Sequence, residues 1–183
     1  MKRCISVLLT LLILLTSLIA GGAISASAAG ITDHIVINGY DPKGFLDILD
    51  GMWWTIDRNL TLHDTYLSAM ATYIDCIRNG VTTIFDHHAS FGSIGGSLFE
   101  IEKAAKETGV RSCLCYDISD RDGMDKAKAS VMENAEFIRH ALKDDSGMIA
   151  GMMGMHAQFT ISDETFGLAA ANKPDEAVRP LVA

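Results

Sequence analysis

Hydrophobic and polar residues alternate along the chain in blocks that predict strands separated by amphipathic helices. Apolar residues recur every three or four positions in the helical blocks, whereas the strand blocks are short and rich in β-branched residues. The helical blocks span residues 61–79, 97–108, 122–142 and 162–171, and the strand blocks span residues 81–85, 110–116 and 149–155. This alternation is typical of a parallel sheet whose strands are joined by crossover helices.

Helix boundaries are marked by capping residues and glycines. Thr61 with Asp64, and Ser97 with Glu100, each predict a capping box at the start of a helix. Gly80 follows the first of these helices and accepts the left-handed turn that ends it. These signals indicate that the helices and strands are separate elements.

Two further helices are expected at the ends of this region. One begins at Pro42 and carries apolar residues at helical spacing, namely Phe45, Leu46, Leu49, Met52 and Trp53. The other is capped by either Thr160 or Ser162 and runs to about residue 171. No pattern is evident in the tail, residues 173–183.

The first 28 residues resemble a secretory signal peptide. Lys2 and Arg3 precede an apolar run over residues 5–20, and Ala26 to Ala28 supply a small-x-small cleavage pattern. Secretion or export to a periplasm is the expectation, and a membrane anchor is the alternative if the leader is not cleaved. Residues 29–44 are then a linker with a short strand at 35–37.

Composition and charge exclude some classes of binding partner. The chain of 183 residues is 49% hydrophobic and has a formal net charge of −8, which argues against nucleic acid or an anionic membrane as a partner. After the leader only Cys76, Cys113 and Cys115 remain, and this odd, sparse set is not a disulfide framework. Cys113 and Cys115 are expected to be buried apolar residues.

Polar residues follow each predicted strand at its carboxyl end, where parallel α/β folds place their chemistry. Asp86, His87 and His88 follow the first strand, Asp117 the second and His156 the third. Because side chains alternate, Asp86 and His87 face opposite ways. Carboxylates and imidazoles at one rim suit metal-assisted hydrolysis. Spacing alone does not predict a metal site, since a catalytic zinc needs three placed ligands.

Glycines at positions 92, 95 and 96 lie between a strand and a helix, where a phosphate could bind. They lack the spacing of a dinucleotide or P-loop motif, so loop flexibility is the preferred interpretation.

Three segments of the chain carry a family resemblance. They read FLDILDGMWWTIDRNLTLHDTYLSAMATYIDCIRNGVTTIFDHHASFGSIGGSLFEI, RSCLCYDISDRDG and GMMGMHAQFTISDET. Over about residues 45–172 the chain closely resembles the SsnA-type aminohydrolases, in the chlorohydrolase and deaminase branch of the amidohydrolase superfamily. The resemblance implies an α/β fold, a (β/α)8 barrel that uses a divalent metal, zinc or iron, to hydrolyse C–N or C–halogen bonds, commonly on nitrogen heterocycles.

The resemblance also implies roles for individual residues. The strand at 81–85 is similar to the second barrel strand of the family and the one ending at His156 to the fourth, whose histidine lies at the substrate. His156, Asp86 and His87 are therefore the candidate substrate-binding residues. The metal ligands of the family come from a His-x-His pair on the first strand and from strands five, six and eight. The chain matches none of these positions, and His87 and His88 do not replace them.

Two functions are expected from these observations. The preferred one is a partial barrel, about strands two to four, from a metal-dependent amidohydrolase that is inactive by itself and binds no metal alone. Its exposed sheet edges would favour homo-oligomers. The alternative is a secreted, non-catalytic α/β module, stable by itself or as a homo-oligomer that completes the sheet. The resembled family is cytoplasmic, which conflicts with the leader.

Overall fold

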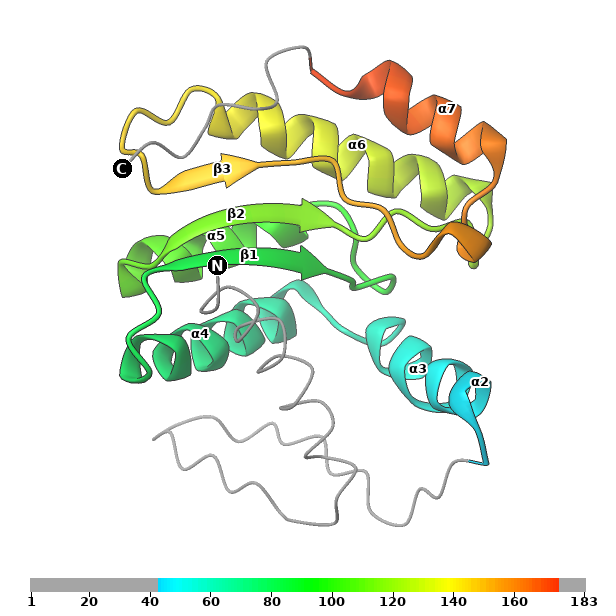
Figure 1. Ribbon diagram of the computed structural model, residues 1–183, viewed down its shortest axis with the longest axis horizontal. Coiled ribbons are helices and arrows are strands. Elements are labelled where there is room, and N and C mark those ends of the chain that lie inside the picture. The colour runs from blue at the N-terminus through cyan, green and yellow to red at the C-terminus, as the bar shows by residue number, and fades with distance from the viewer. Residues whose placement is uncertain (1–42, 175–183) are drawn as a thin grey trace.

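A layer of helices packs against one side of a small parallel sheet (Figure 1). The computed structural model describes residues 43–174. The predicted signal peptide at 1–28, the predicted strand at 35–37 and most of the tail at 173–183 lie outside these residues. The domain boundaries proposed from the sequence therefore stay predictions.

The sheet has the strand order β1-β2-β3, and both pairings are parallel, as the alternation of strands and helices predicts. The strands are β1 (Thr83–His88), β2 (Arg111–Tyr116) and β3 (Ile149–Gly151). β1 begins two residues later than predicted and continues through His88, so the Asp-His-His triplet lies within the strand. β3 ends at Gly151, and beyond it a single bridge joins Ile118 to Met155.

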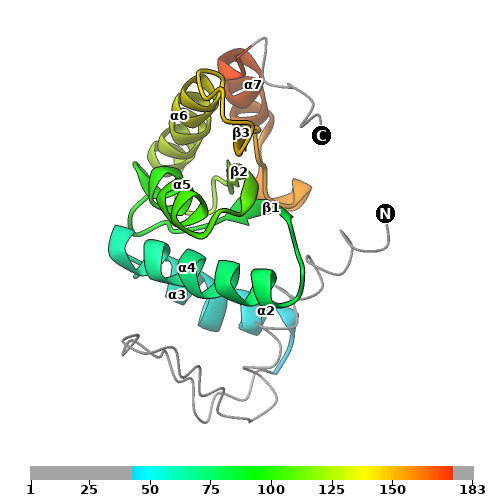
Figure 2. The same ribbon diagram turned by 90° about the vertical axis from the view of Figure 1, so that its left-hand side faces the viewer.

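Helices α4, α5 and α6 arc around one side of the sheet, and α7 packs on α6 (Figure 2). The helical elements are α2 (Phe45–Ile48), the π-helical η1 (Leu49–Trp53), α3 (Trp54–Asp57), α4 (Leu62–Arg78), α5 (Ser97–Thr108), α6 (Met124–Ala141), the 3-10 helix η2 (Gln158–Thr160) and α7 (Asp163–Asn172). The described residues thus have the layout of successive strand–helix units, with the helices outside.

The start of α4 follows the sequence prediction. The Thr61 backbone N–H donates to Asp64 Oδ2 at 2.9 Å, and the Asp64 N–H donates to Thr61 Oγ1 at 3.2 Å, which completes the capping box. Gly80 follows the helix with a φ of 73°. For α7 the cap is Ser162, not Thr160, because Ser162 Oγ accepts the Thr165 N–H at 3.3 Å.

The capping box predicted at Ser97 and Glu100 is wrong. Instead, Glu133 reaches across from α6, and its carboxylate accepts the N–H groups of Gly96 at 2.8 Å and Leu98 at 2.9 Å. A carboxylate at this position satisfies free N–H groups and complements the helix dipole. Glu133 lies 37 positions from Gly96 and 35 from Leu98 in the sequence, so no local pattern could show this cap.

The core lies between the helices and the sheet. Its largest fully buried side chains include Tyr73, Leu98, Leu114, Tyr116 and Phe137. Cys113 and Cys115 are buried and free, as expected. The described chain thus buries a continuous apolar layer beneath α4, α5 and α6.

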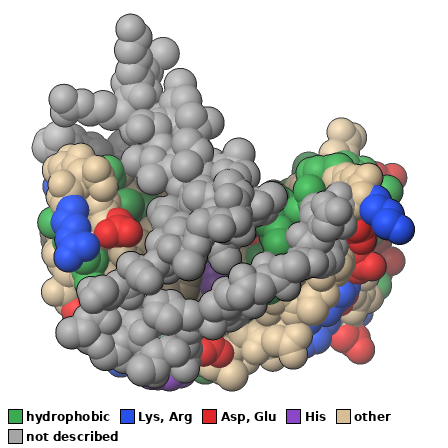
Figure 3. Space-filling model, turned by 90° about the horizontal axis from the view of Figure 1, so that it is seen from below, with side chains coloured by type: hydrophobic (Ala, Val, Ile, Leu, Met, Phe, Trp, Pro, Cys, Tyr) green, Lys and Arg blue, Asp and Glu red, His purple; other side chains and the backbone are tan. Residues whose placement is uncertain are grey.

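Some apolar positions expected in the core lie outside it. Phe45 and Leu46 are exposed, and so is Ile77 at the end of α4. The buried residues of α4 are Thr65 together with Ala69 and Tyr73, two of the apolar residues expected there. On the face of the molecule that is seen from below, the right-hand part has hydrophobic side chains toward the middle and charged side chains on the outer rim (Figure 3).

Within residues 43–174 no helix has the length and apolar character to cross a membrane.

Candidate active site

The adjacent histidines of β1 point to opposite sides of the sheet. His88 lies on the side covered by helices, with Ile84, whereas His87 lies on the other side, with the half-exposed Phe85. Alternation along a strand requires this separation. The two imidazoles therefore have different surroundings although they are neighbours in sequence.

His88 is locked into the helix-covered side. Ser90 Oγ donates its proton to the Ser93 carbonyl oxygen at 3.0 Å. In the hydrogen bond of 2.9 Å between His88 Nε2 and Ser90 Oγ, the donor is therefore His88 Nε2. The His88 ring meets Tyr116 edge to face at 5.8 Å between centroids, and the Tyr116 hydroxyl accepts the Ser90 N–H at 3.0 Å. Burial and the neighbouring His87 lower the pKa of His88 to about 4, which keeps it neutral.

His87 faces a buried carboxyl from the next strand. β1 pairs His87 with Cys115, and Asp117 follows two residues later on the same face of the sheet. His87 Nε2 lies 3.6 Å from Asp117 Oδ1, with the His87 side chain 43% exposed and the Asp117 side chain 6% exposed. Among the described residues Asp117 Oδ1 has no hydrogen-bond partner.

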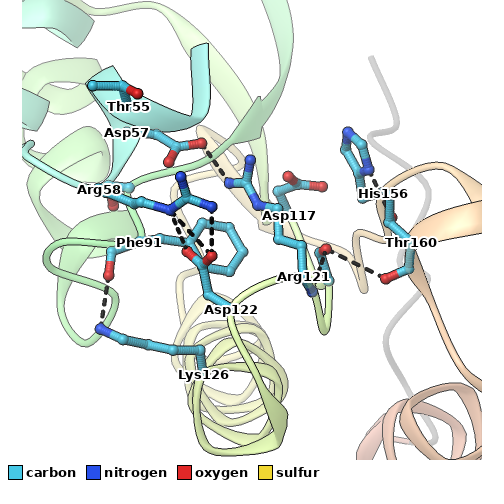
Figure 4. A network of polar contacts seen from close by, with 12 residues as sticks. Thr55, Asp57, Arg58, Phe91, Asp117, Arg121, Asp122, Lys126, His156 and Thr160 are labelled. Atoms are coloured by element: carbon cyan, nitrogen blue, oxygen red, sulfur yellow. Dashed lines mark hydrogen bonds and ion pairs between the residues drawn. The ribbon is translucent and has the colours of Figure 1, made fainter. Parts of the chain in front are cut away.

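A buried arginine lies beside Asp117 (Figure 4). The Arg121 side chain is only 5% exposed and forms an ion pair with Asp57 at the end of α3. Its guanidinium lies over the rings of Trp54 and Phe91, at 4.9 and 4.1 Å from their centroids. Stacking of this kind suits the weakly hydrated guanidinium and compensates part of the cost of its burial.

A second arginine strengthens the same contact between segments. Arg58 grips Asp122 with three hydrogen bonds of 2.7 to 3.1 Å, a bidentate arrangement. Lys126 donates to the Phe91 carbonyl oxygen at 2.7 Å from the first turns of α6. Together these contacts fix α3 and the loop after β1 over the carboxyl ends of the strands (Figure 4).

His156 approaches the same region from the segment after β3. Thr160 Oγ1 donates to the Ala157 carbonyl oxygen at 2.7 Å. In the hydrogen bond of 2.7 Å between His156 Nδ1 and Thr160 Oγ1, the donor is therefore His156 Nδ1. Its Nε2 then carries the lone pair. His156 lies near enough to Arg121 and His87 for both to lower its pKa, after the larger effect of burial.

These five residues, Asp57, His87, Asp117, Arg121 and His156, are here named the strand-end cluster. Burial raises the pKa of Asp117 to about 7, with the Arg121 charge opposing and the Asp57 charge adding to this shift. Burial likewise raises the pKa of Asp57 to about 6 despite its ion pair with Arg121. Burial lowers the pKa of His87. Perturbed carboxyls and imidazoles at one place are typical of functional sites.

Of the candidate residues from the sequence, His87 and His156 join this cluster and Asp86 does not. Asp86 lies on the helix-covered side of β1, where its charge acts on Tyr73 and Cys76 of α4. Burial raises its pKa to about 6. The role of each residue in substrate binding stays a prediction.

Sequence reasoning did not select Asp57, Asp117 or Arg121 as site residues. Asp117 carried a usable signal, since it follows a predicted strand two residues beyond the partner of His87. Asp57 and Arg121 are 64 residues apart, and no local spacing connects them. Their pairing becomes visible only in the folded chain.

The glycines after β1 have structural reasons other than flexibility. A Cβ on Gly92 would lie 2.5 Å from the Arg58 carbonyl oxygen, so glycine permits the loop to pack against the end of α3. Gly96 has a φ of 87°, which favours glycine. These residues therefore hold the loop close to the strand-end cluster.

The residues described here do not offer a metal site. No three His, Cys, Asp or Glu side chains among residues 43–174 are grouped so that they could hold a metal ion. The strand-end cluster therefore does not fit the ligand set that a catalytic metal requires.

The chain is similar in sequence to several known deaminases. The chain is 28% identical over 130 residues to the 5'-deoxyadenosine deaminase of Methanosarcina barkeri, a match covering 70% of this chain and 28% of that enzyme. It is 27% identical over 111 residues to the 5-methylthioadenosine/S-adenosylhomocysteine deaminase of Pyrococcus furiosus, covering 61% and 25%. The chain is similar, at a distance, to deaminases of the amidohydrolase superfamily.

Other comparisons set the extent of this similarity. The 5'-deoxyadenosine deaminase of Methanococcus maripaludis is 29% identical over 127 residues, covering 68% of this chain and 28% of that enzyme. The chain thus spans about a quarter of the length of these curated relatives. No family model and no solved structure matches it.

Proposed function

We propose that the described residues form the substrate-side wall of an amidohydrolase-type deaminase, of the SsnA type, that hydrolyses a C–N bond of a small nitrogen heterocycle. In this proposal β1, β2 and β3 correspond to strands two to four of a (β/α)8 barrel. The observation that carries it is the convergence of His87, Asp117 and His156 at the carboxyl ends of parallel strands, where such folds bind substrate. The similarity to nucleoside deaminases supports the same chemistry.

The family implies a divalent metal that supplies a reactive hydroxide, and the strand-end cluster does not fit the metal's ligand set. The cluster has another use in this proposal. Its imidazoles offer hydrogen-bonding atoms to the nitrogen groups of a substrate, and the rings of Trp54 and Phe91 pack against Arg121 beside them.

We further propose that the chain of 183 residues does not deaminate by itself. The described part contains three paired strands, and a closed barrel needs eight. The test is ammonia release from 5'-deoxyadenosine by the purified chain, together with elemental analysis for zinc and iron. No ammonia and less than stoichiometric metal are expected. Turnover with one tightly bound metal ion per chain would overturn this part of the proposal.

Binding tests the substrate-side wall separately from turnover. In ¹H–¹⁵N spectra of the purified chain, 5'-deoxyadenosine is expected to shift the imidazole signals of His87 and His156 and to leave His88 unchanged. Shifts confined to residues away from the strand ends, or no shift at millimolar ligand, would contradict the proposal. A glucose titration serves as the control for nonspecific effects.

One observation favours a second function, a self-associating module without catalysis. In the described sheet β1 pairs on one side only, and Phe85 on its open face is 50% exposed. An unpaired edge beside an apolar side chain favours association with another strand. Sedimentation of the chain and of Phe85→Glu distinguishes the two: a defined oligomer with a cooperative melt, lost in the variant, supports the module, whereas a monomer contradicts it.

A further inference from the structure

Two imidazoles of the strand-end cluster have predictable protonation. His156 donates from Nδ1 to Thr160 Oγ1, whose own proton goes to the Ala157 carbonyl oxygen, so the lone pair of His156 lies on Nε2. This assignment follows from the proton of a single hydroxyl group. It makes the outer nitrogen of His156 a hydrogen-bond acceptor.

The same reasoning about donors and acceptors applies to the His87 ring. Asp117 Oδ1 is buried and lacks a hydrogen-bond donor among the described residues, and the nearest ring nitrogen is His87 Nε2 at 3.6 Å. A carboxylate can only accept hydrogen bonds. The distance is longer than a formed hydrogen bond, and such contacts in ligand-free sites shorten when a ligand closes them.

We propose that Asp117 is a positioning residue that holds His87 in the Nε2–H tautomer, so that His87 Nδ1 accepts a hydrogen bond from the amino group of a nitrogen heterocycle. The deaminase proposal supplies the ligand class, and this inference rests on it. An exocyclic –NH₂ donates hydrogen bonds, which matches an acceptor nitrogen. Asp117 acts through His87 and does not itself contact the ligand.

Arg121 and Asp57 hold the Asp117 side chain in its position beside His87. Arg121 lies beside Asp117 and opposes the effect of burial on that carboxyl, and Asp57 anchors Arg121. The stacked rings of Trp54 and Phe91 leave the guanidinium little freedom to move. The acceptor at Asp117 therefore has a fixed position.

The tautomers can be measured without any ligand. Long-range ¹H–¹⁵N spectra of the full chain at pH 8 are expected to show Nε2–H for His87 and Nδ1–H for His156. In Asp117→Leu, His87 is expected to become a mixture of both tautomers, and Asp117→Asn, which keeps an acceptor oxygen, restores the single form. Asp125→Asn, on the exposed side of α6, is the control and leaves all histidines unchanged.

A fixed Nδ1–H form of His87 in the unaltered chain would overturn the proposal, and so would a His87 tautomer insensitive to Asp117→Leu in a folded protein. Folding of each variant is checked by the His88 signals, because His88 lies on the other side of β1.

The ligand class is tested with adenosine and inosine, which differ by an amino group and a carbonyl oxygen. Adenosine is expected to bind about tenfold more tightly than inosine, the effect of one to two neutral hydrogen bonds. Asp117→Leu should remove most of this preference. Correct tautomers with no nucleoside binding would contradict the deaminase proposal and the acceptor role of His87 Nδ1, and would leave the positioning role of Asp117 intact. Nucleoside binding without the adenosine preference would contradict the acceptor role of His87 Nδ1 and leave the deaminase proposal intact.

Discussion

His87 and His88 are adjacent in one strand, yet the two sides of the sheet treat them differently. On the helix-covered side His88, Ser90 and Tyr116 satisfy one another with hydrogen bonds. On the other side the strand-end cluster buries charged groups and leaves Asp57 Oδ1, Asp117 Oδ1 and Arg121 Nε without partners among the described residues. Buried polar atoms without partners cost free energy, and Thr65 Oγ1, Tyr73 Oη and Ser97 Oγ in the helices also lack partners among the described residues. What distinguishes the cluster is that its atoms without partners belong to charged groups, whose burial costs more than that of hydroxyl groups.

The largest effect is expected from removing the buried cation of the cluster. Arg121→Leu leaves the Asp57 carboxyl buried and unpaired, which should lower the free energy of unfolding by about 3–5 kcal/mol. Urea denaturation measures it. The control Arg58→Leu, at a side chain 38% exposed, should cost about 1 kcal/mol or less.

A double variant separates the unpaired charge from lost packing. Asp57→Leu combined with Arg121→Leu should recover most of the stability that Arg121→Leu loses, since the Asp57 carboxylate is no longer buried without its partner. A double variant as unstable as the single one would show that stacking on Trp54 and Phe91, not the charge, is what the arginine provides.

The histidine pair itself gives an intermediate effect. His88→Ala removes an aromatic contact and a hydrogen bond and should cost about 2 kcal/mol of unfolding free energy. His87→Ala, at a half-exposed side chain, should cost about 0.5 kcal/mol or less. Equal costs in matched urea titrations at pH 8 would remove the distinction between the two sides.

The last expected effect is a difference in the pH dependence of stability. The pKa of His88 is lowered to about 4, so its contribution to stability is present above the unfolded value near 6.5 and is lost as the pH falls from there toward 4. The pKa of Asp117 is raised to about 7, so the folded state holds its proton over the range from about 3.8 to 7, and stability falls as the pH rises through that range.

The two groups therefore oppose each other between pH 4 and 6.5. His88→Asn should make the protein less sensitive to acid, and Asp117→Asn should make it more sensitive, each by up to about 1.4 kcal/mol per pH unit. Urea midpoints at pH 5 and pH 7 measure both slopes. Slopes that change in the same direction for both variants would contradict the assignment.

Local signals predicted much of the fold. Thr61 and Asp64 marked the start of α4, Gly80 marked its end, and the order of strands and helices indicated the parallel sheet. These features depend on neighbours in sequence, which is why they are visible there. The short extent of β3 and the exposure of Phe45 depend on tertiary packing and were missed.

The site was less accessible to sequence reasoning. Alternation along β1 predicted that the side chains of Asp86 and His87 lie on opposite faces of the sheet. It could not say which of them would lie on the same face as the polar residues that follow the other strands. The register that puts His87 opposite Cys115 decided it in favour of His87. Glu133 and Arg121 act on partners 35 or more residues away, and only the folded structure brings them together.

The two arginine contacts across the loops have one more consequence. Asp57 and Arg58 meet Arg121 and Asp122, and both contacts span 64 positions. Sliding one segment past the other by one residue would place Asp57 against Asp122, or Arg58 against Arg121. Like-charge repulsion therefore disfavours a shift of this helical segment by one residue. The order of charges in the two dipeptides thus helps to fix the register in which α3 docks on the loop after β2.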